Sequence, residues 1–545
     1  MREKRPGVRR VRRMARETFG YQNLRPGQEA AIQSALAGRD TLAVMPTGAG
    51  KSAIYQLVGI ELPGPTVVVS PLIALQRDQV EAIREQQVGG AAVLNSTIRA
   101  SERRTAFEQL QQQQVEFVFL APEQFSNQEV LEQLRAARPS LFVVDEAHCI
   151  TEWGHDFRPD YLKLGAVIEA LGHPTVLALT ATAAPPVRQE IVERLGMRDP
   201  QTIVRGFDRP NIWLSVEMYH DEASKRRALL DRVAESEAPG IVYAATRKRA
   251  EALAEALRER GLAAASYHAG MKSRERDHVH TAFMRDELAV VVATTAFGMG
   301  IDKPNVRFVF HYDISESVDA YYQEIGRAGR DGEPADAILF YRPEDIGIRR
   351  FFGGSGQVDA DQIERVALAV HACAAPIASQ ELREALGLSQ SQLLAALGRL
   401  EDVGVVVTSG DGLVAPGAAT GDLRAIAATA ARNLRDRRSF GRSRLEMIRG
   451  YAEARDCRRE FVLTYFGEEF DGPCEFCDNC DAGRNILRDK EAEPYPVGGR
   501  VAHRAWGPGS VIRYEAEKIV VLFDSVGYKT LALDLVAQAG LLAPA

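Results

Sequence analysis

The chain has 545 residues, of which 46% are hydrophobic and 26% carry charge, and this composition is ordinary for a folded protein with several domains. The formal net charge of −7 excludes a protein that is basic throughout, although a local basic patch can still bind nucleic acid. Six cysteines are too few for a disulfide framework, and no apolar run is long enough to span a bilayer, so we expect a protein of the reducing cytoplasm without a membrane partner.

The chain begins with a basic segment, MREKRPGVRRVRRMARE. No apolar core follows it, so it does not have the pattern of a secretory signal. We interpret residues 1–13 as a solvated tail, and the alternative is an arm that contacts phosphate.

Two stretches of alternating strands and helices follow. In residues 14–207 the runs TLAVM, TVVVS, VEFVFLA, LFVVD and TVLALTAT alternate with amphipathic segments, and in residues 208–352 the runs GIVYAAT, LAVVVATT, VRFVFHYD and AILFY do the same. Nearly continuous β-branched runs are typical of strands that are buried on both faces of a parallel sheet. The sequence therefore predicts two similar α/β domains in tandem, with a cleft between them.

Residues 359–420 follow a linker, GGSGQ, and are predicted to form three helices and a hairpin, which is the pattern of a winged helix. Ser379 is expected to cap one helix, Gly387 to end it, and Ser389 or Ser391 to cap the next. The helix that would read DNA, SQSQLLAALGRLED, has a single arginine, so we favour packing or a protein contact there.

The remaining segments are a helical region and a small β domain. Residues 421–484 are predicted to be helical, and their cationic stretch ARNLRDRRSFGRSRLEMIRG either binds phosphate or is a solvated surface. Residues 496–545 are predicted to form four or five short strands that close into a small SH3-like barrel. Trp506, Phe523 and Tyr528 form either a contact surface or part of the barrel core, and we favour the core.

The stretch MPTGAGKS lies between the first predicted strand and a helix. Gly48 and Gly50 let backbone N–H groups curve around a phosphate, and the start of the helix points its positive end at the same place. Lys51 can reach the β- and γ-phosphates of ATP, and Ser52 can bind Mg²⁺. The strict GxxxxGK[ST] pattern is not met, so the alternative is a chance glycine-rich turn. We expect this loop, Thr47 included, to bind ATP.

Two acidic residues emerge directly from an apolar strand in LFVVDEAHCI. Asp145 can hold Mg²⁺ through water, and Glu146 can orient or activate the water that attacks ATP. The alternative is a pair that only caps the strand. Together with the glycine-rich loop, this motif predicts an NTPase.

The second α/β domain contains YYQEIGRAGRDG, in which Gln323, Arg327 and Arg330 are expected along one face of a helix. Arginines that face a γ-phosphate across a cleft stabilise the charge of the transition state. The alternative is a surface helix with salt bridges. We favour an arginine finger that makes the cleft responsive to ATP.

Four of the six cysteines are close together in the sequence, namely Cys457, Cys474, Cys477 and Cys480. Four thiolates at this spacing fit tetrahedral Zn²⁺. A CxxCxxC pattern also occurs in iron–sulfur proteins, and zinc is the interpretation that we favour.

Taken in chain order, a series of motifs resembles those of RecQ-type superfamily-2 DNA helicases: FGYQNLRPGQ, MPTGAGKS, VVVSPLIALQRDQV, DEAHCITEWGHDFRPDY, LTATA, YHAG, TTAFGMGIDKPNVRFVFHYD and YYQEIGRAGRDG. The aromatic-rich WGHDFRP distinguishes RecQ proteins from other DEAH-box proteins. CRREFVLTYFGEEF and CEFCDNC resemble the RecQ zinc-binding subdomain. Ala49 in the phosphate loop and Thr151-Glu152 before WGHDFRP depart from the family pattern, and neither change removes a group that contacts phosphate.

The resemblance implies an enzyme that couples ATP hydrolysis to 3′-to-5′ movement on single-stranded DNA and to unwinding, in DNA repair and recombination. It implies that Tyr21 stacks on adenine, and that Asp302 lies near the nucleotide. It also implies that Arg25 and Gln28 read the edge of the base. The residues that it implies for DNA contact or for coupling are Trp153, His155, Phe157, Arg158, Thr180, Thr182, Thr294 and Thr295.

The order of the C-terminal segments departs from the family pattern, because the winged-helix-like segment precedes the zinc subdomain and no region of HRDC size remains. The strand-separating wing of the family is therefore not carried over. The barrel resembles the tails of some UvrD-type helicases, which implies contact with a protein partner, such as RNA polymerase, or with DNA. We predict a monomeric helicase that needs ATP, Mg²⁺ and Zn²⁺; the alternatives are a DNA-stimulated translocase that does not unwind and a weakly catalytic scaffold.

Overall fold

The computed structural model describes most of the chain. The described residues are 8–25, 27–46, 48–71, 73–85, 89–95, 98, 100–112, 114–151, 158–298, 301–349, 360–373, 375–408, 413–417, 423–468, 470, 472–484, 493–515 and 517–545. The chain divides into two compact units, Met1–Arg342 with Gly450–Arg488 and Pro343–Arg449 with Asp489–Ala545.

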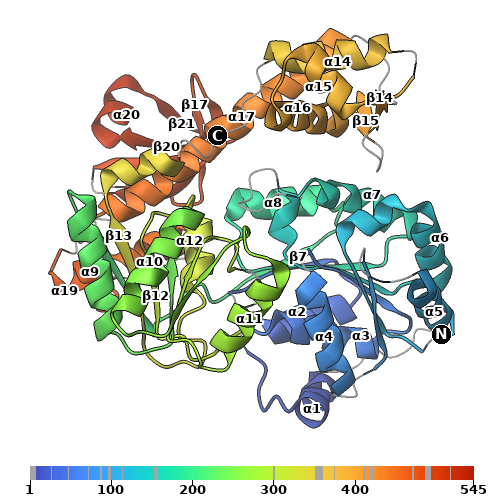
Figure 1. The fold of residues 1–545 in the computed structure, drawn as a ribbon, viewed down its shortest axis with the longest axis horizontal. Helices are drawn as coiled ribbons and strands as arrows, with labels where there is room; N and C mark the ends of the chain where they lie inside the picture. Colours follow the sequence, from blue (N-terminus) through green and yellow to red (C-terminus); the bar gives the residue numbers. More distant parts are fainter. Residues whose placement is uncertain are drawn as a thin grey trace. The chain divides into compact units, whose positions relative to one another are not determined.

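The first unit contains two parallel sheets, coloured from blue to cyan and from green to yellow in Figure 1. The first sheet has the order β3-β4-β2-β5-β6-β1-β7, and all its neighbouring strands are parallel. Its strands are β1 (Thr41–Val44), β2 (Thr66–Val69), β3 (Ala91–Leu94), β4 (Phe117–Leu120), β5 (Leu141–Val144), β6 (Thr175–Thr180) and β7 (Gln201–Val204). Every residue of β1, β2, β4 and β5 is buried, as expected for strands covered on both faces.

Two helices precede the first strand, and helices and short 3₁₀ turns connect the others. They are α1 (Val8–Phe19), α2 (Gln28–Leu36), α3 (Lys51–Glu61), α4 (Ile73–Glu85), α5 (Ala100–Gln111), η1 (Pro122–Ser126), α6 (Gln128–Ala137), η2 (Ala147–Ile150), η3 (Pro159–Lys163), α7 (Leu164–Ala170) and α8 (Pro185–Arg194). This arrangement confirms the predicted α/β architecture of the N-terminal part.

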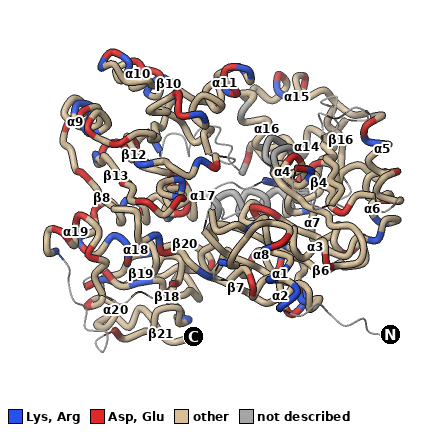
Figure 2. The backbone as a smooth tube through the Cα atoms, turned by 90° about the horizontal axis from the view of Figure 1, so that it is seen from below, with Lys and Arg blue, Asp and Glu red and all other residues tan. Residues whose placement is uncertain are grey.

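Helix α1 carries most of the basic segment that the sequence suggested to be a tail. Val11, Ala15 and Phe19 lie at helical spacing and are buried in the core of the first domain. Its arginines, blue in Figure 2, are on the exposed side, where Arg12 forms an ion pair with Glu29. The segment is therefore helical from Val8 onward, because its apolar stripe has a core to pack against.

The second sheet has the order β10-β11-β9-β12-β13-β8 and is also parallel throughout. Its strands are β8 (Ile212–Met218), β9 (Gly240–Tyr243), β10 (Ala264–Tyr267), β11 (Val290–Ala293), β12 (Phe308–His311) and β13 (Ala335–Tyr341). Its helices are α9 (Glu222–Glu235), α10 (Arg247–Glu259), α11 (Ser273–Met284) and α12 (Val318–Ile325). The prediction of a second parallel α/β domain is confirmed.

The cysteine-containing segment packs on the edge strand β8 of the second sheet. It includes the end of α17 (Leu423–Glu453), together with α18 (Arg458–Tyr465) and α19 (Asp478–Asp481). Asp478 accepts a hydrogen bond from the backbone N–H of Val216 at 3.0 Å, and Asp481 accepts one from the indole of Trp213 at 2.9 Å. The segment thus covers part of an otherwise unpaired sheet edge.

The second unit contains a helical module with a small antiparallel sheet, in the order β14-β16-β15. Its elements are α14 (Ala360–Ala372), β14 (Ile377–Ala378), α15 (Ser379–Leu386), α16 (Gln390–Asp402), β15 (Val406–Thr408) and β16 (Leu413–Pro416), and η4 (Pro343–Asp345) precedes them. Gly387 ends α15 in a left-handed conformation, and Ser389 caps α16, as predicted. The expected cap at Ser379 is wrong, because α15 begins at this residue and Ala378 occupies the N-cap.

The C-terminal part of the second unit is a five-stranded antiparallel sheet, in the order β20-β19-β18-β17-β21. Its elements are β17 (Arg500–His503), β18 (Gly507–Glu515), β19 (Lys518–Phe523), β20 (Gly527–Ala532), α20 (Leu533–Ala539) and β21 (Leu542–Pro544). The sequence analysis did not anticipate α20. Phe523 and Tyr528 are buried, in agreement with the core interpretation, and Trp506 is half-buried and stacked on His503.

Candidate active site and zinc centre

The glycine-rich loop follows β1 and leads into α3. Gly48 and Gly50 have φ values of +79° and +71°, a region that side chains disfavour. A Cβ atom at Gly50 would lie only 2.7 Å from Nε2 of Gln28. Gly50 is also the N-cap of α3, so the backbone N–H groups of the first turn are directed toward the loop. Thr47 lies outside the described residues.

Lys51 is folded onto this loop. Its Nζ donates to the backbone oxygens of Met45 and Pro46, at 3.3 and 3.4 Å. Burial lowers the pKa of Lys51, and the carboxylates of Glu146 and Asp145 act in the opposite direction. The ammonium group therefore lies where a phosphate oxygen could replace a carbonyl as its acceptor. Ser52 is half-buried in the first turn of α3.

Gln28 ties the segment before α2 to the phosphate loop. Its Oε1 accepts the N–H of Arg25 at 2.7 Å, and its Nε2 donates to the backbone oxygens of Ala49 and Gly50, both at 2.9 Å. The side chain that was predicted to read adenine is therefore engaged with the phosphate loop. Tyr21 stacks on Phe19 and is 38% exposed, so part of its ring is accessible to a flat ligand.

The two acidic residues lie directly after β5. The N–H of Glu146 donates to Oδ1 of Asp145 at 3.0 Å, and the hydroxyl of Tyr161 donates to the backbone oxygen of Asp145 at 3.1 Å. Burial, followed by the neighbouring carboxylate of Glu146, raises the pKa of Asp145 to about 7. A bound cation stabilises such a carboxylate in its charged form, and carboxylate oxygens are ligands that a hard metal ion prefers.

His148 is a residue of this site that sequence reasoning did not select, although it is the histidine of the DEAH letters. Its Nδ1 lies 2.9 Å from Oγ1 of Thr180 and 3.3 Å from Oε2 of Glu146. The hydroxyl of Thr180 also donates to the backbone oxygen of Thr182. His148 therefore connects the acidic pair to the two threonines at the end of β6.

The expectation that Gln323, Arg327 and Arg330 share one face of a helix is wrong. Helix α12 ends at Ile325 with Gly326 as its C-cap, so that only Gln323 is helical. Both arginines lie in the turn that follows, which contains left-handed glycines at Gly329 and Gly332. Three glycines in seven residues terminate the helix despite the apparent periodicity.

Arg330 nevertheless reaches the phosphate loop of the other sheet domain. A Cβ atom at Gly48 would lie 3.6 Å from Cγ and Cδ of Arg330. Arg330 forms an ion pair with Asp302, whose side chain is 86% exposed. Burial and the neighbouring Arg327 lower the pKa of Arg330 to about 10, so it remains charged at neutral pH. Arg327 is buried, and its guanidinium lies near Gly298.

The candidate DNA-contacting residues are described only in part. Trp153, His155 and Phe157 lie outside the described residues. Arg158 donates to the backbone oxygen of Pro71 at 2.9 Å. Thr294 and Thr295 follow the end of β11, where Thr294 is half-buried and Thr295 exposed.

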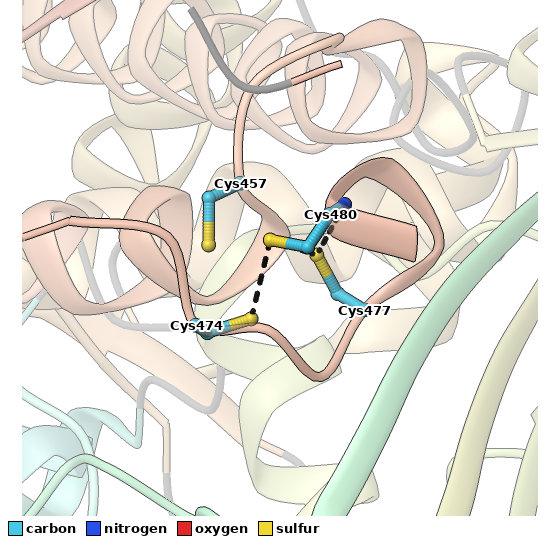
Figure 3. Close-up of side chains that lie close together, drawn as sticks. All are labelled: Cys457, Cys474, Cys477 and Cys480. Carbon is cyan, nitrogen blue, oxygen red and sulfur yellow. Dashed lines mark hydrogen bonds between the residues drawn. The ribbon is translucent and has the colours of Figure 1, made fainter. Parts of the chain in front are cut away.

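The four cysteines of the C-terminal segment converge on one point, as Figure 3 shows. Their sulfur atoms all lie within 4.8 Å of one another. A tetrahedral Zn²⁺ with Zn–S bonds of about 2.3 Å separates its ligands by about 3.8 Å. The sulfurs of Cys474 and Cys480 are 3.7 Å apart, and those of Cys477 and Cys480 are 3.3 Å apart. The cluster is therefore close to the geometry that zinc requires, with Cys457 as its fourth ligand.

Three family models match this chain. They are DEAD/DEAH box helicase over residues 25–191, helicase conserved C-terminal domain over residues 224–332 and RecQ zinc-binding over residues 421–481. A relative from Bacillus subtilis, described as probable ATP-dependent DNA helicase RecS, is 42% identical over 349 residues, which are 64% of this chain and 70% of that protein. The chain belongs to the RecQ family of helicases.

A second RecQ relative, ATP-dependent DNA helicase RecQ of Pasteurella multocida, is 35% identical over 463 residues. The aligned part is 85% of this chain but 61% of that protein, so this chain spans less than two thirds of it. A solved structure of Mycobacterium smegmatis helicase Lhr bound to ssDNA and AMP-PNP is 22% identical, with a TM-score of 0.51, over 77% of this chain and 61% of that chain. At that identity the likeness supports the fold alone, with its two RecA-like domains.

The RecQ assignment places the four-cysteine cluster inside the zinc-binding model and assigns the two sheet domains to the two helicase models. The helical module from α14 to β16 and the C-terminal sheet lie outside all three matched ranges. Among the helices of the described ranges, none is long and apolar enough to cross a membrane.

Proposed function

We propose that this protein is an ATP-dependent DNA helicase that moves 3′ to 5′ along single-stranded DNA and unwinds duplexes in DNA repair and recombination. The observation that carries the proposal is the approach of Arg330, from the second RecA-like domain, to the phosphate loop of the first. Residues from both domains at one nucleotide site make hydrolysis depend on how the domains are arranged, and that is how a motor converts hydrolysis into movement.

In this proposal the first domain binds the nucleotide. Tyr21 stacks on adenine and Arg25 contacts the edge of the base, while Gln28 holds this segment to the phosphate loop. The backbone of Thr47, Gly48 and Gly50 surrounds the phosphates. Lys51 exchanges its carbonyl acceptors for phosphate oxygens.

Hydrolysis requires a metal ion and a positioned water. Ser52 and Asp145 would hold Mg²⁺, which neutralises charge on the phosphates when it is bound. Glu146 orients the attacking water. Arg330 stabilises the charge that develops on the γ-phosphate, with Arg327 and Gln323 in support and Asp302 as its partner before ATP binds.

DNA contact is proposed for two segments. Trp153, His155, Phe157 and Arg158 contact single-stranded DNA in this proposal, with the aromatic rings stacking on bases and the arginine pairing with phosphate. Thr294 and Thr295 contact the DNA backbone. His148 contacts both Glu146 and Thr180. In this proposal, these contacts couple DNA binding to the position of Glu146 in the ATP site.

The remaining segments have supporting roles. The zinc ion stabilises a short segment that has little core of its own. We assign residues 359–420 to a winged-helix-like module and residues 496–545 to an SH3-like module that contacts a protein partner. The protein acts as a monomer in the cytoplasm.

A second candidate function is a DNA-stimulated translocase that does not separate strands. It is favoured by the single arginine in α16, which offers little for gripping a duplex. A scaffold without catalysis is disfavoured, because it has no need for Lys51, Asp145, Glu146 and Arg330 together.

The deciding experiment is strand separation of duplexes with a 3′ or a 5′ single-stranded tail, in the presence of ATP and Mg²⁺. Unwinding of only the 3′-tailed duplex, lost in Lys51→Ala, supports the proposed helicase and its polarity. If neither duplex is unwound while single-stranded DNA still stimulates ATP hydrolysis, the translocase is correct. If ATP hydrolysis is absent as well, the scaffold remains.

A further inference from the structure

The segment between the two RecA-like domains contains an arginine whose side chain bonds to the turn after α12. Arg209 lies between β7 and β8, and its guanidinium donates three hydrogen bonds to backbone oxygens. The acceptors are Gly326 at 3.1 Å, Ala328 at 2.7 Å and Gly329 at 3.0 Å. All three belong to the turn after α12 that carries Arg327 and Arg330.

Asn211 holds the same turn from the neighbouring position. Its side-chain amide donates to the backbone oxygens of Gly329 and Glu333, both at 2.8 Å. The fit is close, because a Cβ atom at Gly329 would overlap the amide nitrogen of Asn211 and lie 2.7 Å from the oxygen of Glu333. The backbone oxygens of the turn thus accept five side-chain hydrogen bonds from two residues of the linker.

Arg209 also lies beside Arg330 itself. The Nε of Arg330 lies 3.5 Å from the oxygen of Gly326, which is also an acceptor for Arg209. The positive charge of Arg209 contributes to lowering the pKa of Arg330. The two guanidinium groups are therefore close, and they share one carbonyl.

The linker is fixed in turn by the zinc-binding segment. Nη2 of Arg459, on α18, donates to the backbone oxygens of Arg209 at 3.2 Å and of Ile212 at 2.9 Å. Nε of Arg459 lies 3.4 Å from a carboxylate oxygen of Asp208. Glu468, beyond the end of α18, accepts the N–H of Phe207 at 2.8 Å.

We propose that Arg209 and Asn211 are positioning residues for Arg330: they hold the turn after α12 so that the guanidinium of Arg330 is presented to the γ-phosphate of ATP. The inference rests on the proposed role of Arg330 in ATP hydrolysis. Arg209 and Asn211 lie in the covalent connection between the domains. A change in domain arrangement therefore moves these two residues and, through their hydrogen bonds, the turn that carries Arg330. Neither residue touches the nucleotide in this account, so their loss affects hydrolysis without weakening ATP binding.

The test is the DNA-stimulated ATPase of Arg209→Lys and Asn211→Ala in the full chain. Lysine keeps the charge but has no planar fork to reach three carbonyls. A displacement of about 1 Å can cost about 100-fold in rate, so we expect kcat to fall by about 10- to 100-fold. The KM for ATP and the zinc content should remain unchanged, while the lost hydrogen bonds should lower the melting temperature by a few degrees. Arg226→Ala, an exposed arginine on α9, is the matched control and should leave all of these values unaltered.

Binding of ADP with aluminium fluoride, a mimic of the transferring phosphate, separates positioning from general damage. Arg209→Lys and Arg330→Ala should each weaken this complex relative to ADP alone, and the double variant should be no weaker than Arg330→Ala. Effects of the two changes that multiply would overturn the inference, and so would an equal loss of affinity for ADP. If Arg330→Ala hydrolyses ATP normally, the proposed function of Arg330 fails instead. If only Arg209→Lys is normal, the positioning role alone fails.

Discussion

Two loops, one on each RecA-like domain, meet at the candidate ATP site, and they are held in different ways. The phosphate loop takes its shape mainly from neighbouring residues, with positive φ at Gly48 and Gly50 and a helix that begins at Lys51, and its side-chain hydrogen bonds from Gln28 span only 21 and 22 residues. The turn after α12 receives its side-chain hydrogen bonds from Arg209 and Asn211, which lie 117 to 122 residues earlier in the chain. The first loop can form once the nearby elements α2, β1 and α3 exist, whereas the second needs the linker to be in place.

The largest expected effect comes from removing the zinc, because the zinc segment fixes the linker. We expect Cys477→Ser to lose bound zinc and most of its soluble yield, since a structural zinc contributes about 10 kcal/mol to folding. Metal analysis of the purified protein provides the measurement. Cys373→Ser, at a half-buried cysteine outside the cluster, is the control and should keep its zinc. Normal zinc content and folding in Cys477→Ser would contradict the metal assignment.

Arg330→Ala should have the next largest effect, through the second loop alone. Loss of an arginine finger lowers kcat by about 10³-fold or more, while nucleotide affinity changes far less. Steady-state ATP hydrolysis with saturating single-stranded DNA measures this effect. A variant whose kcat stays within tenfold of the wild type would show that the arginine does not face the γ-phosphate.

The same substitution in each loop should separate the two kinds of support. In Gly50→Ala the new Cβ strains the backbone and collides with Gln28, so we expect the KM for ATP to rise by about tenfold for a strain of about 1–2 kcal/mol. In Gly329→Ala it collides with Asn211, so we expect kcat to fall by about tenfold instead.

Gly261→Ala is the matched control for both glycine variants. Gly261 has a φ of +83°, and a Cβ atom at this position would have no other atom within 4 Å. The substitution therefore introduces backbone strain without a collision. We expect lower stability with unchanged kcat and KM. The distinction between the loops would be lost if Gly50→Ala and Gly329→Ala changed the same kinetic constant.

The smallest effect is expected at the contact between the zinc segment and the edge of the second sheet. Trp213→Phe removes the indole hydrogen bond to Asp481 and keeps an aromatic ring in place. A hydrogen bond to a charged group contributes about 1.5 kcal/mol or more, so thermal denaturation should show a small loss of stability. Stability equal to that of the wild type would mean that this contact adds nothing to the attachment of the zinc segment.

Much of the site could be predicted from the sequence because its parts are contiguous. The glycines before Lys51 stand between a strand and a helix, where a loop around a phosphate is the expected conformation. The carboxylates directly follow the buried strand β5, where a role in binding a metal ion or water is expected. The four cysteines could be recognised as one centre because their spacing suits a single metal ion. Each of these signals depends on near neighbours in the chain.

Other features could not be predicted because they depend on distant packing. The spacing of Gln323, Arg327 and Arg330 suggested a helix, but the glycines and the bonds from Arg209 end it at Ile325. In the basic N-terminal segment, Val11, Ala15 and Phe19 have helical spacing, but the core that they pack against is formed by distant segments. His148 was part of a recognised motif, but its link to Thr180 exists only when β5 and β6 are adjacent.

By itself the sequence determined the architecture of two parallel α/β domains, the phosphate loop, the acidic pair and the zinc cluster, because apolar periodicity, glycine conformation and ligand spacing are local properties. Only the tertiary structure decided that Arg330 reaches the phosphate loop, and that Arg209 and Asn211 hold the turn that carries it. Those contacts join segments that are far apart in the chain, and their hydrogen bonds form only after both sheets and the linker have packed.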